Sequence, residues 1–335
     1  MDKIKYLFKR ITSMSFKNMF KTIDEIHEKT NLNRVRLFFD MIYCGLRYQA
    51  GYMDYKLYEM YDLNASQRKT IITRGINNAI VKKYNNLEYS KIFNDKLLFN
   101  EKYSKYLGRD WLKVTEDNYR EFESFALKNK EIVIKPPIGS CGKGVEIVKV
   151  TKENVQKIYK NILETKRYLV EEKATQIEEL KKIHPTSINT MRVVTLNGYV
   201  VAAYLRMGNK NNFVDNFNSE GLVAPINIET GVLDYVAIDK KMNIYKEHPI
   251  SKITIKGFQI PNWDKVKKFS EEVAKEVPEL GYVGWDVSQN EKGPYLIEAN
   301  EFPGHDIYQL PPHRTNGIGL LPTFKEAMKK RKRRK

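Results

Sequence analysis

The segment from Ile132 to Val150 constrains the fold of this chain more than any other. It consists of a β-branched run that ends on Lys135, a loop with three glycines, and a second β-branched run. Because β-branched residues favour strands, the segment predicts two strands joined by a glycine-rich loop. Glycine has no Cβ, so the backbone N–H groups of such a loop can approach an anion closely. The loop therefore indicates a grip for a polyphosphate, with Lys135 and Lys143 adding positive charge.

The loop differs from a Walker A motif, in which Gly-Lys-Ser/Thr runs into a helix. Here Gly142-Lys143-Gly144 runs into Val145, Ile147 and Val148, which favour a strand. A loop between two strands can fold over phosphates as a flap. The alternative from these residues alone is a plain hairpin turn with solvated lysines. Cys141 in the loop has no evident base beside it, so we do not interpret it as a nucleophile.

Composition limits the class of protein. The chain has 335 residues, of which 41% are hydrophobic and 12% aromatic, so it can bury a substantial core. Its two cysteines, Cys44 and Cys141, lie too far apart to suggest a zinc motif or a disulfide framework. No apolar run is long enough for a transmembrane helix, and the N-terminus lacks an apolar signal region. A cytoplasmic location is the expectation.

The chain is strongly basic, with a net charge of +17. The last seven residues, Lys329 to Lys335, are all lysine or arginine. Such a tail binds acidic lipid, nucleic acid or an acidic glycan, or is simply solvated. Residues 1–30 have apolar residues at helical spacing with lysines between them, which suits a membrane-surface helix or a helix packed on the protein's own core.

The chain is predicted to be an α+β protein. Residues 1–108 are helix-rich and aromatic, whereas strands and helices alternate from about residue 112. Asn197-Gly198 predicts a hairpin turn. The predicted strands cover 131–135, 144–150, 167–172, 190–196, 199–207, 232–238, 252–256, 282–288 and 294–299, and the predicted helices of this part cover 116–129, 152–163, 175–182 and 263–276.

A second group of polar residues lies near the C-terminus. Glu298 and Asn300 are two apart on a predicted strand, so both side chains leave the same face. Asp286 lies on the partner strand of the hairpin, and pairing in an even register puts it on that face too. Two carboxylates and an amide oxygen are ligands that suit Mg²⁺ bound to phosphates. The alternative is a solvated polar face.

A phosphate grip and a magnesium site together imply a nucleoside triphosphate, and at this point the chain resembles the ATP-grasp superfamily. Lys135 resembles the nucleotide lysine before the family's flexible loop, and Asp286, Glu298 and Asn300 resemble its metal-binding residues. The resemblance implies an ATP-grasp fold, in which two α+β lobes grip ATP, and ATP and Mg²⁺ as cofactors. The nucleotide-binding residues that it implies are Lys96, Lys135, Gly139, Ser140, Gly142, Lys143, Gly144, Val170, Glu171, Glu172 and Glu179.

A closer resemblance is to the sugar-transfer-associated ATP-grasp family of bacterial polysaccharide synthesis and its teichuronopeptide-synthesis relatives. It covers about residues 35–325. The similar segments are Phe39–Cys44 through Gln67–Lys69, His184–Thr195, Val214–Phe217 and Gly304–Gln309. The chain differs from many ATP-grasp ligases at Trp285, where others often have an arginine beside the metal aspartate.

This resemblance implies a helical N-terminal region at 1–108, a small lobe at 109–172, a large lobe at 173–325 and a basic tail at 326–335. It also implies an ATP- and Mg²⁺-dependent carboxylate–amine ligase that forms an acyl phosphate on a sugar or glycan precursor. Arg192 and Arg206 would stabilise charge in place of the missing arginine. The expected partners are a small-molecule or lipid-linked sugar, an amino acid or amine, and an anionic membrane at the basic ends, but no nucleic acid. A kinase-like phosphotransferase and a non-catalytic basic adaptor are the alternatives.

Overall fold

A computed structural model describes residues 15–139, 143–209, 217 and 220–330. The chain forms two compact units. The first contains the residues up to Lys83 together with Gly304–Lys330, and the second contains Tyr84–Pro303. The C-terminal residues after Pro303 therefore belong with the helical N-terminal residues. Among the described residues, no helix is both long and apolar enough to cross a bilayer.

The first unit is helical. Its first helix begins after Ser15, whose side chain accepts a hydrogen bond from the Asn18 N–H and so caps the helix. The buried Gln309 side chain ties the C-terminal segment to this unit, because its amide exchanges hydrogen bonds with the backbone of Ile72. The helices are α2 (Phe16–Thr30), α3 (Arg34–Tyr48), α4 (Tyr52–Leu57), α5 (Ala65–Arg68), α6 (Arg74–Tyr84) and α13 (Leu321–Lys329).

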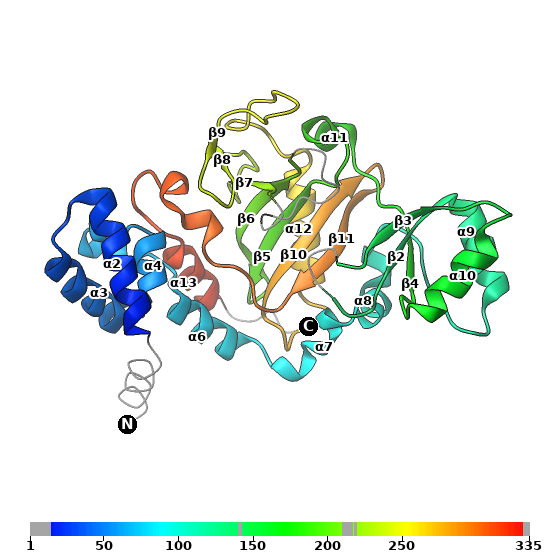
Figure 1. Ribbon diagram of the computed structural model, residues 1–335, viewed down its shortest axis with the longest axis horizontal. Coiled ribbons are helices and arrows are strands. Elements are labelled where there is room, and N and C mark those ends of the chain that lie inside the picture. Colours follow the sequence, from blue (N-terminus) through cyan, green and yellow to red (C-terminus); the bar gives the residue numbers. More distant parts are fainter. Residues whose placement is uncertain (1–14, 140–142, 210–216, 218–219, 331–335) are drawn as a thin grey trace. The chain divides into compact units, whose positions relative to one another are not determined.

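The second unit contains two antiparallel sheets (Figure 1). The smaller has the order β1-β4-β2-β3, and helices α9 and α10 cover one of its faces. Strand alternation sets its two faces: Ile132, Ile134 and Val170 enter the core beneath the helices, so their neighbours in sequence face the other way. These elements are β1 (Trp111–Lys113), α9 (Tyr119–Asn129), β2 (Glu131–Lys135), β3 (Glu146–Lys149), α10 (Val155–Glu164) and β4 (Leu169–Glu172).

The larger sheet has seven strands in the order β11-β10-β5-β6-β7-β8-β9. Helices α7 (Lys91–Asn94), α8 (Lys96–Tyr103) and α12 (Trp263–Val273) contribute to its core, and α11 (Glu178–Ile183) leads into it. The strands are β5 (Thr190–Leu196), β6 (Tyr199–Met207), β7 (Leu222–Pro225), β8 (Ala237–Ile238), β9 (Ile244–Tyr245), β10 (Tyr282–Asn290) and β11 (Gly293–Asn300).

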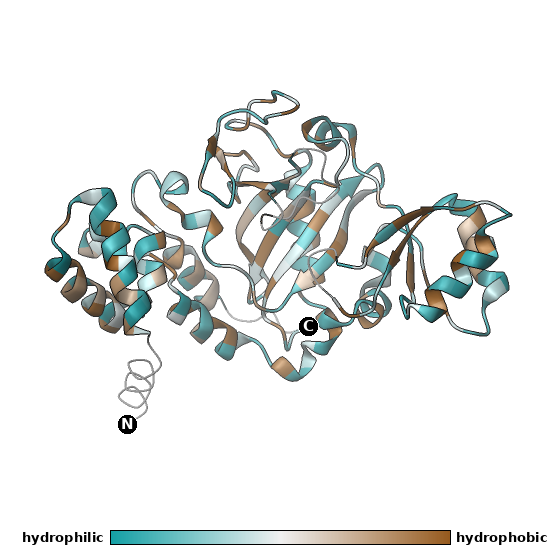
Figure 2. Cartoon of the chain, viewed as in Figure 1, coloured by the Kyte–Doolittle hydropathy of each residue, from teal (hydrophilic) through white to brown (hydrophobic). Residues whose placement is uncertain are grey.

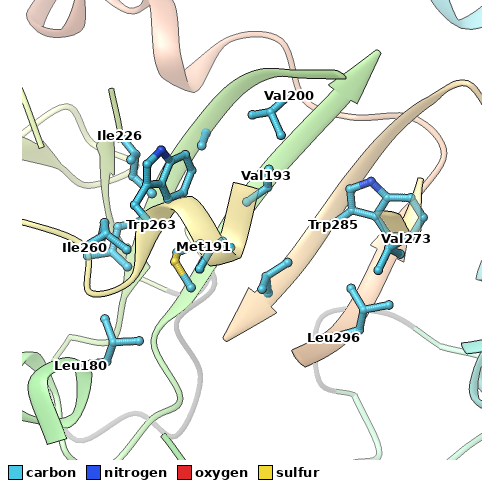
Figure 3. Packing of buried hydrophobic residues seen from close by; sticks show 14 of the residues in the cluster. Leu180, Met191, Val193, Val200, Ile226, Ile260, Trp263, Val273, Trp285 and Leu296 are labelled. Atoms are coloured by element: carbon cyan, nitrogen blue, oxygen red, sulfur yellow. The ribbon is translucent and has the colours of Figure 1, made fainter. Parts of the chain in front are cut away.

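The main core lies on one face of the larger sheet (Figure 3). Trp285 of β10 is fully buried there, and its ring meets those of Phe93 and Tyr103 edge-on. The indole N–H donates to the Thr195 hydroxyl at 2.8 Å, so the one polar atom of this side chain is satisfied. Because Trp285 points into the core, its neighbour Asp286 points to the opposite face of the sheet.

The predicted hairpin of 190–196 and 199–207 and the strand at 131–135 occur with the bounds that the sequence predicts. The prediction of a strand over 232–238 is wrong for most of its length, because β8 contains only Ala237–Ile238. The prediction at 252–256 is also wrong, since only Thr254 forms an isolated bridge. Gly231 and Lys252, which lie at the start of these two segments, adopt positive φ. Val232 and Thr254 pair only through single bridges, with Gln259 and Glu247. Strands β1, β7 and β9 have at most four residues and were not predicted.

Replacing Trp285 by Phe should lower the free energy of unfolding by about 1–3 kcal/mol, because the change leaves a gap and an unpaired Thr195 hydroxyl. Urea unfolding followed by far-UV circular dichroism measures this. The matched control is Trp111→Phe at a half-buried position on β1, which should change stability by less than about 1 kcal/mol. Equal losses in the two variants would contradict the role given to Trp285.

Candidate functional site

A cleft of about 650 Å³ lies between the two sheets of the second unit. Its apolar lining includes Val133, Ile147 and Ile297, and its polar lining includes charged residues from both sheets. This size and mixed lining suit a small-molecule ligand. The charged residues that line it are Arg109, Lys135, Glu171, Glu172, Lys173, Lys181, Arg206, Asp286 and Glu298.

Lys135 lies on the wall of the cleft formed by the smaller sheet. Its ammonium group donates to the carboxylate of Glu171, which is buried on the neighbouring strand β4. Arg109 donates to both oxygens of the same carboxylate at 3.0 Å, and Asn100 donates to it at 2.8 Å. Glu171 is therefore occupied by three donors, and it fixes the position of the Lys135 ammonium.

The charge of Glu171 depends on its two cationic partners. Burial alone would raise the pKa of this carboxyl, but the charges of Arg109 and Lys135 more than offset burial and hold the pKa well below its usual range. Arg109 also donates to the carbonyls of Leu107 and Leu296 at 3.1 and 2.6 Å. Since Leu296 belongs to β11, this guanidinium joins the smaller sheet to the larger one.

Lys96 approaches the start of the glycine-rich loop from helix α8. Its side chain donates to the Gly139 carbonyl at 2.6 Å, and its backbone N–H donates to the Pro137 carbonyl at 2.8 Å. Asp95 caps the helix by accepting from the N–H groups of the two residues that follow Lys96. Burial and then the nearby charge of Lys135 lower the pKa of Lys96, against the opposing effect of carboxylates that include Glu298. The structure thus brings Lys96, Lys135 and Gly139 together around a small cavity.

Asp286 lies on the larger sheet at the opposite side of the cleft. Arg192 of β5 pairs with its carboxylate through Nε and Nη2, and Arg206 of β6 donates to it at 2.6 Å. Burial alone would raise the pKa of Asp286, but the two arginine charges hold it well below its usual range. The pairing is possible because Asp286 lies directly opposite Arg192 in the sheet, and because Gly284 leaves room for the arginine stem: a Cβ there would lie 3.1 Å from Arg192 Cδ.

Glu298 lies directly opposite Asp286 on β11, as the even register predicted. Glu298 lines the cleft, and part of its side chain is exposed to solvent. This position and the negative charge of Asp286 raise the pKa of Glu298 to about 7. Ile297 is the extra residue of a β-bulge, so it faces the cleft beside Glu298.

These residues fit a divalent cation. The negative form of Glu298 is disfavoured beside Asp286, and a cation between the two carboxylates would remove that penalty. Asn300 is exposed on the same face, where its side-chain oxygen accepts from the Phe302 N–H. Oxygen ligands of this kind are those that Mg²⁺ takes. In the described part of the chain, no cluster of three or more His, Cys, Asp or Glu side chains offers a metal site.

The remaining predicted residues lie in different surroundings. Glu172 lines the cleft, and its carboxylate accepts from the Asp110 N–H at 3.1 Å. Val170 is buried beneath α9 and α10, because alternation points it away from the cleft. Glu179 is exposed on α11 and is not among the described residues that line the cleft.

The glycine-rich loop is described at its two ends. Lys143 and Gly144 are exposed, and Gly144 has a φ of 74°, which a residue with a side chain rarely adopts. Ser140 and Gly142 lie outside the described residues.

Sequence reasoning missed Arg109 and the apolar residues of the cleft. Val133 could have been found, since it is two residues before Lys135 on the same strand and so shares its face. Arg109 carried no such signal, because it lies outside a strand or helix and its partners come from distant segments.

Lys135 on one sheet and the acidic pair Asp286 and Glu298 on the other line the same cleft. A model of the family described as sugar-transfer associated ATP-grasp matches residues 76–329, more than half of the chain. The chain therefore belongs to the sugar-transfer associated ATP-grasp family, as its sequence motifs predicted. It is an ATP-dependent ligase of the ATP-grasp type that uses ATP and Mg²⁺.

Solved structures also resemble this chain. D-alanine–D-alanine ligase from Bacillus anthracis is 16% identical, with 76% of this chain and 73% of that chain covered and a TM-score of 0.43. The ATP-grasp ligase PsnB, complexed with a precursor variant, Mg and ADP, is 14% identical, with coverages of 73% and 60% and a TM-score of 0.42. D-cycloserine synthetase DcsG is 10% identical, with coverages of 73% and 72% and a TM-score of 0.41. No curated protein matches the chain significantly.

Replacing Glu171 by Gln should lower the free energy of unfolding at pH 7 by about 3 kcal/mol, because Arg109 then loses its buried counter-charge. The folded-state pKa of Glu171 is depressed, so its stabilising effect is present above the ordinary glutamate pKa and is lost as pH falls below it. The gap between parent and variant should therefore narrow below about pH 4. Urea unfolding between pH 3 and 8 measures this, with the half-buried Glu172→Gln as control. A gap that is constant with pH would contradict the assignment.

Proposed function

We propose that the chain is a carboxylate–amine ligase that modifies a sugar or glycan precursor during the synthesis of capsule or another cell-surface polysaccharide. The observation that carries the proposal is the arrangement at the base of the cleft. There the Asp286 carboxylate is held between Arg192 and Arg206 and faces Glu298, while Lys135 of the smaller sheet and Lys96 of α8 line one cavity with Gly139. Cations on both sides of a cleft suit the transfer of a phosphoryl group to a carboxylate.

The residues of the smaller sheet would hold the nucleotide. Lys135 is positioned by Glu171 and would contact the α- and β-phosphates as a point charge. Lys96 lies beside it, and the backbone of the loop from Gly139 to Gly144 would cover the β- and γ-phosphates. The segment that begins at Glu172, the last residue of β4, would bind adenine, whose ring would pack against the apolar residues of the cleft. Glu179 would receive the ribose only if α11 shifts toward the cleft.

The two arginines of the larger sheet would stabilise the reacting groups. In the proposed reaction, a substrate carboxylate oxygen would attack the γ-phosphorus of ATP and release ADP, which would give an acyl phosphate. An amine would then attack the acyl carbon, and loss of phosphate and of one amine proton would give the amide. Arg192 and Arg206 already neutralise Asp286, and their planar guanidinium groups suit the negative charge that develops on phosphoryl and carbonyl oxygens.

Asp286, Glu298 and Asn300 would hold Mg²⁺. The ion supplies charge neutralisation to the β- and γ-phosphate oxygens. The acidic pair supports this assignment because Glu298 and Asp286 lie directly opposite each other, and a cation bound there would favour the ionised form of Glu298. Asn300 would add a neutral oxygen on the same face.

The substrate class rests on the family, whose description associates it with sugar transfer. We propose a small-molecule or lipid-linked sugar as one substrate and an amino acid or amine as the other. An enzyme acting on lipid-linked precursors gains from residence at the cytoplasmic face of an anionic membrane. The basic tail Lys329–Lys335 and the basic N-terminal residues support such peripheral binding, since each cation near an anionic surface contributes about 1 kcal/mol.

The purified protein should release ADP only when both a carboxylate and an amine are supplied. The screen pairs amino acids with uronic-acid and amino-sugar nucleotides and measures ADP by a coupled assay, with product mass confirming the amide. A kinase-like phosphotransferase would release ADP with a single acceptor and give a phosphorylated product. Either that result or the absence of any ADP-forming pair would contradict the proposed ligase reaction.

Replacing Glu298 by Gln should reduce turnover about 100-fold or more while leaving thermal stability near that of the parent, because a lost ligand weakens charge neutralisation. Asn300→Ala should act in the same direction. The measurements are turnover against Mg²⁺ concentration and the midpoint of thermal unfolding. Glu291→Gln, an exposed change in the turn of the same hairpin, is the matched control. Parent-like turnover in Glu298→Gln would exclude the metal assignment.

A further inference from the structure

Helix α3 has two apolar faces, of which only one is covered. One face is buried in the core of the first unit and consists of Leu37, Met41, Cys44 and Tyr48. The other is solvent-exposed at positions i, i+4, i+8 and i+11, with exposed fractions between 49 and 64%. This second face consists of Val35, Phe39, Tyr43 and Leu46.

The exposed face continues onto helix α2. Phe20 of α2 stacks on Phe38 with 5.7 Å between ring centroids, and the Phe38 ring meets Phe39 edge-on at 5.4 Å. Phe16 lies one turn before Phe20 and is also half exposed. Figure 2 marks the apolar residues of both helices. We call Phe16, Phe20, Val35, Phe39, Tyr43 and Leu46 the aromatic stripe.

The helices that carry the stripe also carry exposed cations. Lys17, Lys21, Arg36 and Arg47 are exposed, as are Lys29 and Arg34, which pair with Glu59 and Asp24. The exposed anions of the two helices are Asp24 and Glu28, so cations outnumber anions on their surface. Ser15 and Lys330, from which the two basic end segments of the chain extend, both belong to this unit. Positive charge is therefore concentrated in sequence around a unit that exposes aromatic side chains.

We propose that the aromatic stripe inserts into the interface of an anionic phospholipid bilayer. This deepens, and rests on, the peripheral membrane binding proposed for the basic ends. An interfacial helix buries its apolar face at the boundary between headgroups and acyl chains, while lysines and arginines at its sides contact lipid phosphates. Large exposed apolar patches on a soluble unit mark interaction surfaces, and lipid is the partner that meets both the aromatic and the cationic requirement.

Other occupants fit less well. A second copy of this chain, paired through the same face, would set a surface on which cations outnumber anions against itself, because an isologous contact joins each patch to its own copy. A nucleic acid would satisfy the cations but would leave the aliphatic side chains of Val35 and Leu46 without a partner. The chain's own residues 1–14 are basic, so they offer no opposite charge, and the acrylamide measurement below tests whether their apolar residues cover the stripe.

The test uses the full chain and vesicles of equal phosphatidylglycerol and phosphatidylcholine, compared with pure phosphatidylcholine, at physiological salt. Co-sedimentation should give binding to the anionic vesicles that falls at least tenfold in the variant Val35→Ser/Phe39→Ser/Tyr43→Ser. The matched control is Ile244→Ser/Ile250→Ser, which removes exposed aliphatic residues from the second unit and should bind as the parent does. Parent-like binding by the triple variant would overturn the proposal.

Insertion itself is measured with the Phe39→Trp variant. Brominated lipids should quench its added fluorescence, and acrylamide should quench it in the absence of vesicles. If the Phe39→Trp protein is a monomer and is protected from acrylamide, the chain covers its own stripe. If it is a protected dimer, and the triple substitution dissociates that dimer, a second copy of the chain covers the stripe. Tight RNA binding lost in the triple variant would assign the stripe to nucleic acid. Each of these outcomes overturns the membrane proposal.

Two further measurements separate this proposal from the functions it rests on. Deleting Lys329–Lys335 tests electrostatic binding by the tail, and it should weaken vesicle binding without changing lipid quenching per bound Phe39→Trp molecule. If the variant without the tail still binds vesicles but its Phe39→Trp fluorescence is no longer quenched by brominated lipid, the stripe does not insert and the proposal is overturned. Ligase turnover on a soluble substrate should be the same in the parent and the triple variant, so a failed ligase screen leaves the lipid result standing.

Discussion

The guanidinium group of Arg109 joins the two sheets that form the cleft. It holds the buried Glu171 carboxylate of the smaller sheet and the Leu296 carbonyl of the larger one. Through Glu171 it also sets the position of Lys135. A buried ion pair adds little net stability against apolar residues of the same size, but removing one partner is costly. The value of this network therefore lies in fixing the geometry of the cleft.

A second buried network, on the larger sheet, follows a different plan. Arg192 and Arg206 share the single carboxylate of Asp286, so these three residues together carry a net positive charge. The pKa of the neighbouring Glu298 is nevertheless raised, by its surroundings and by the charge of Asp286. Cations from both sheets therefore line the cleft together with Glu298. Charges that a fold fixes in advance contribute most to catalysis, because they need no rearrangement during the reaction.

Part of the candidate site could be predicted from the alternation of side chains along single strands. The spacing of Glu298 and Asn300 and the register opposite Asp286 could be derived from strand alternation, and the structure has that register. Strand alternation could also have predicted that Val170 and Glu171 face opposite sides of the sheet, because adjacent residues of a strand do so. The family resemblance placed both residues at the nucleotide, whereas only Glu171 lines the cleft. The short strands β7 and β9 were not predictable, because four and two residues are too few to form a recognisable β-branched or alternating run.

The sequence by itself determined the family, the two strands on either side of the glycine-rich loop and the acidic hairpin, because each is encoded within a few consecutive residues. Only the tertiary structure decided that Arg192 and Arg206 both reach Asp286, that Arg109 holds Glu171, and that α3 leaves a second apolar face exposed. The physical reason is that periodicity specifies which residues share a face, whereas the partner of that face, and the charges that meet across it, depend on segments far apart in the chain.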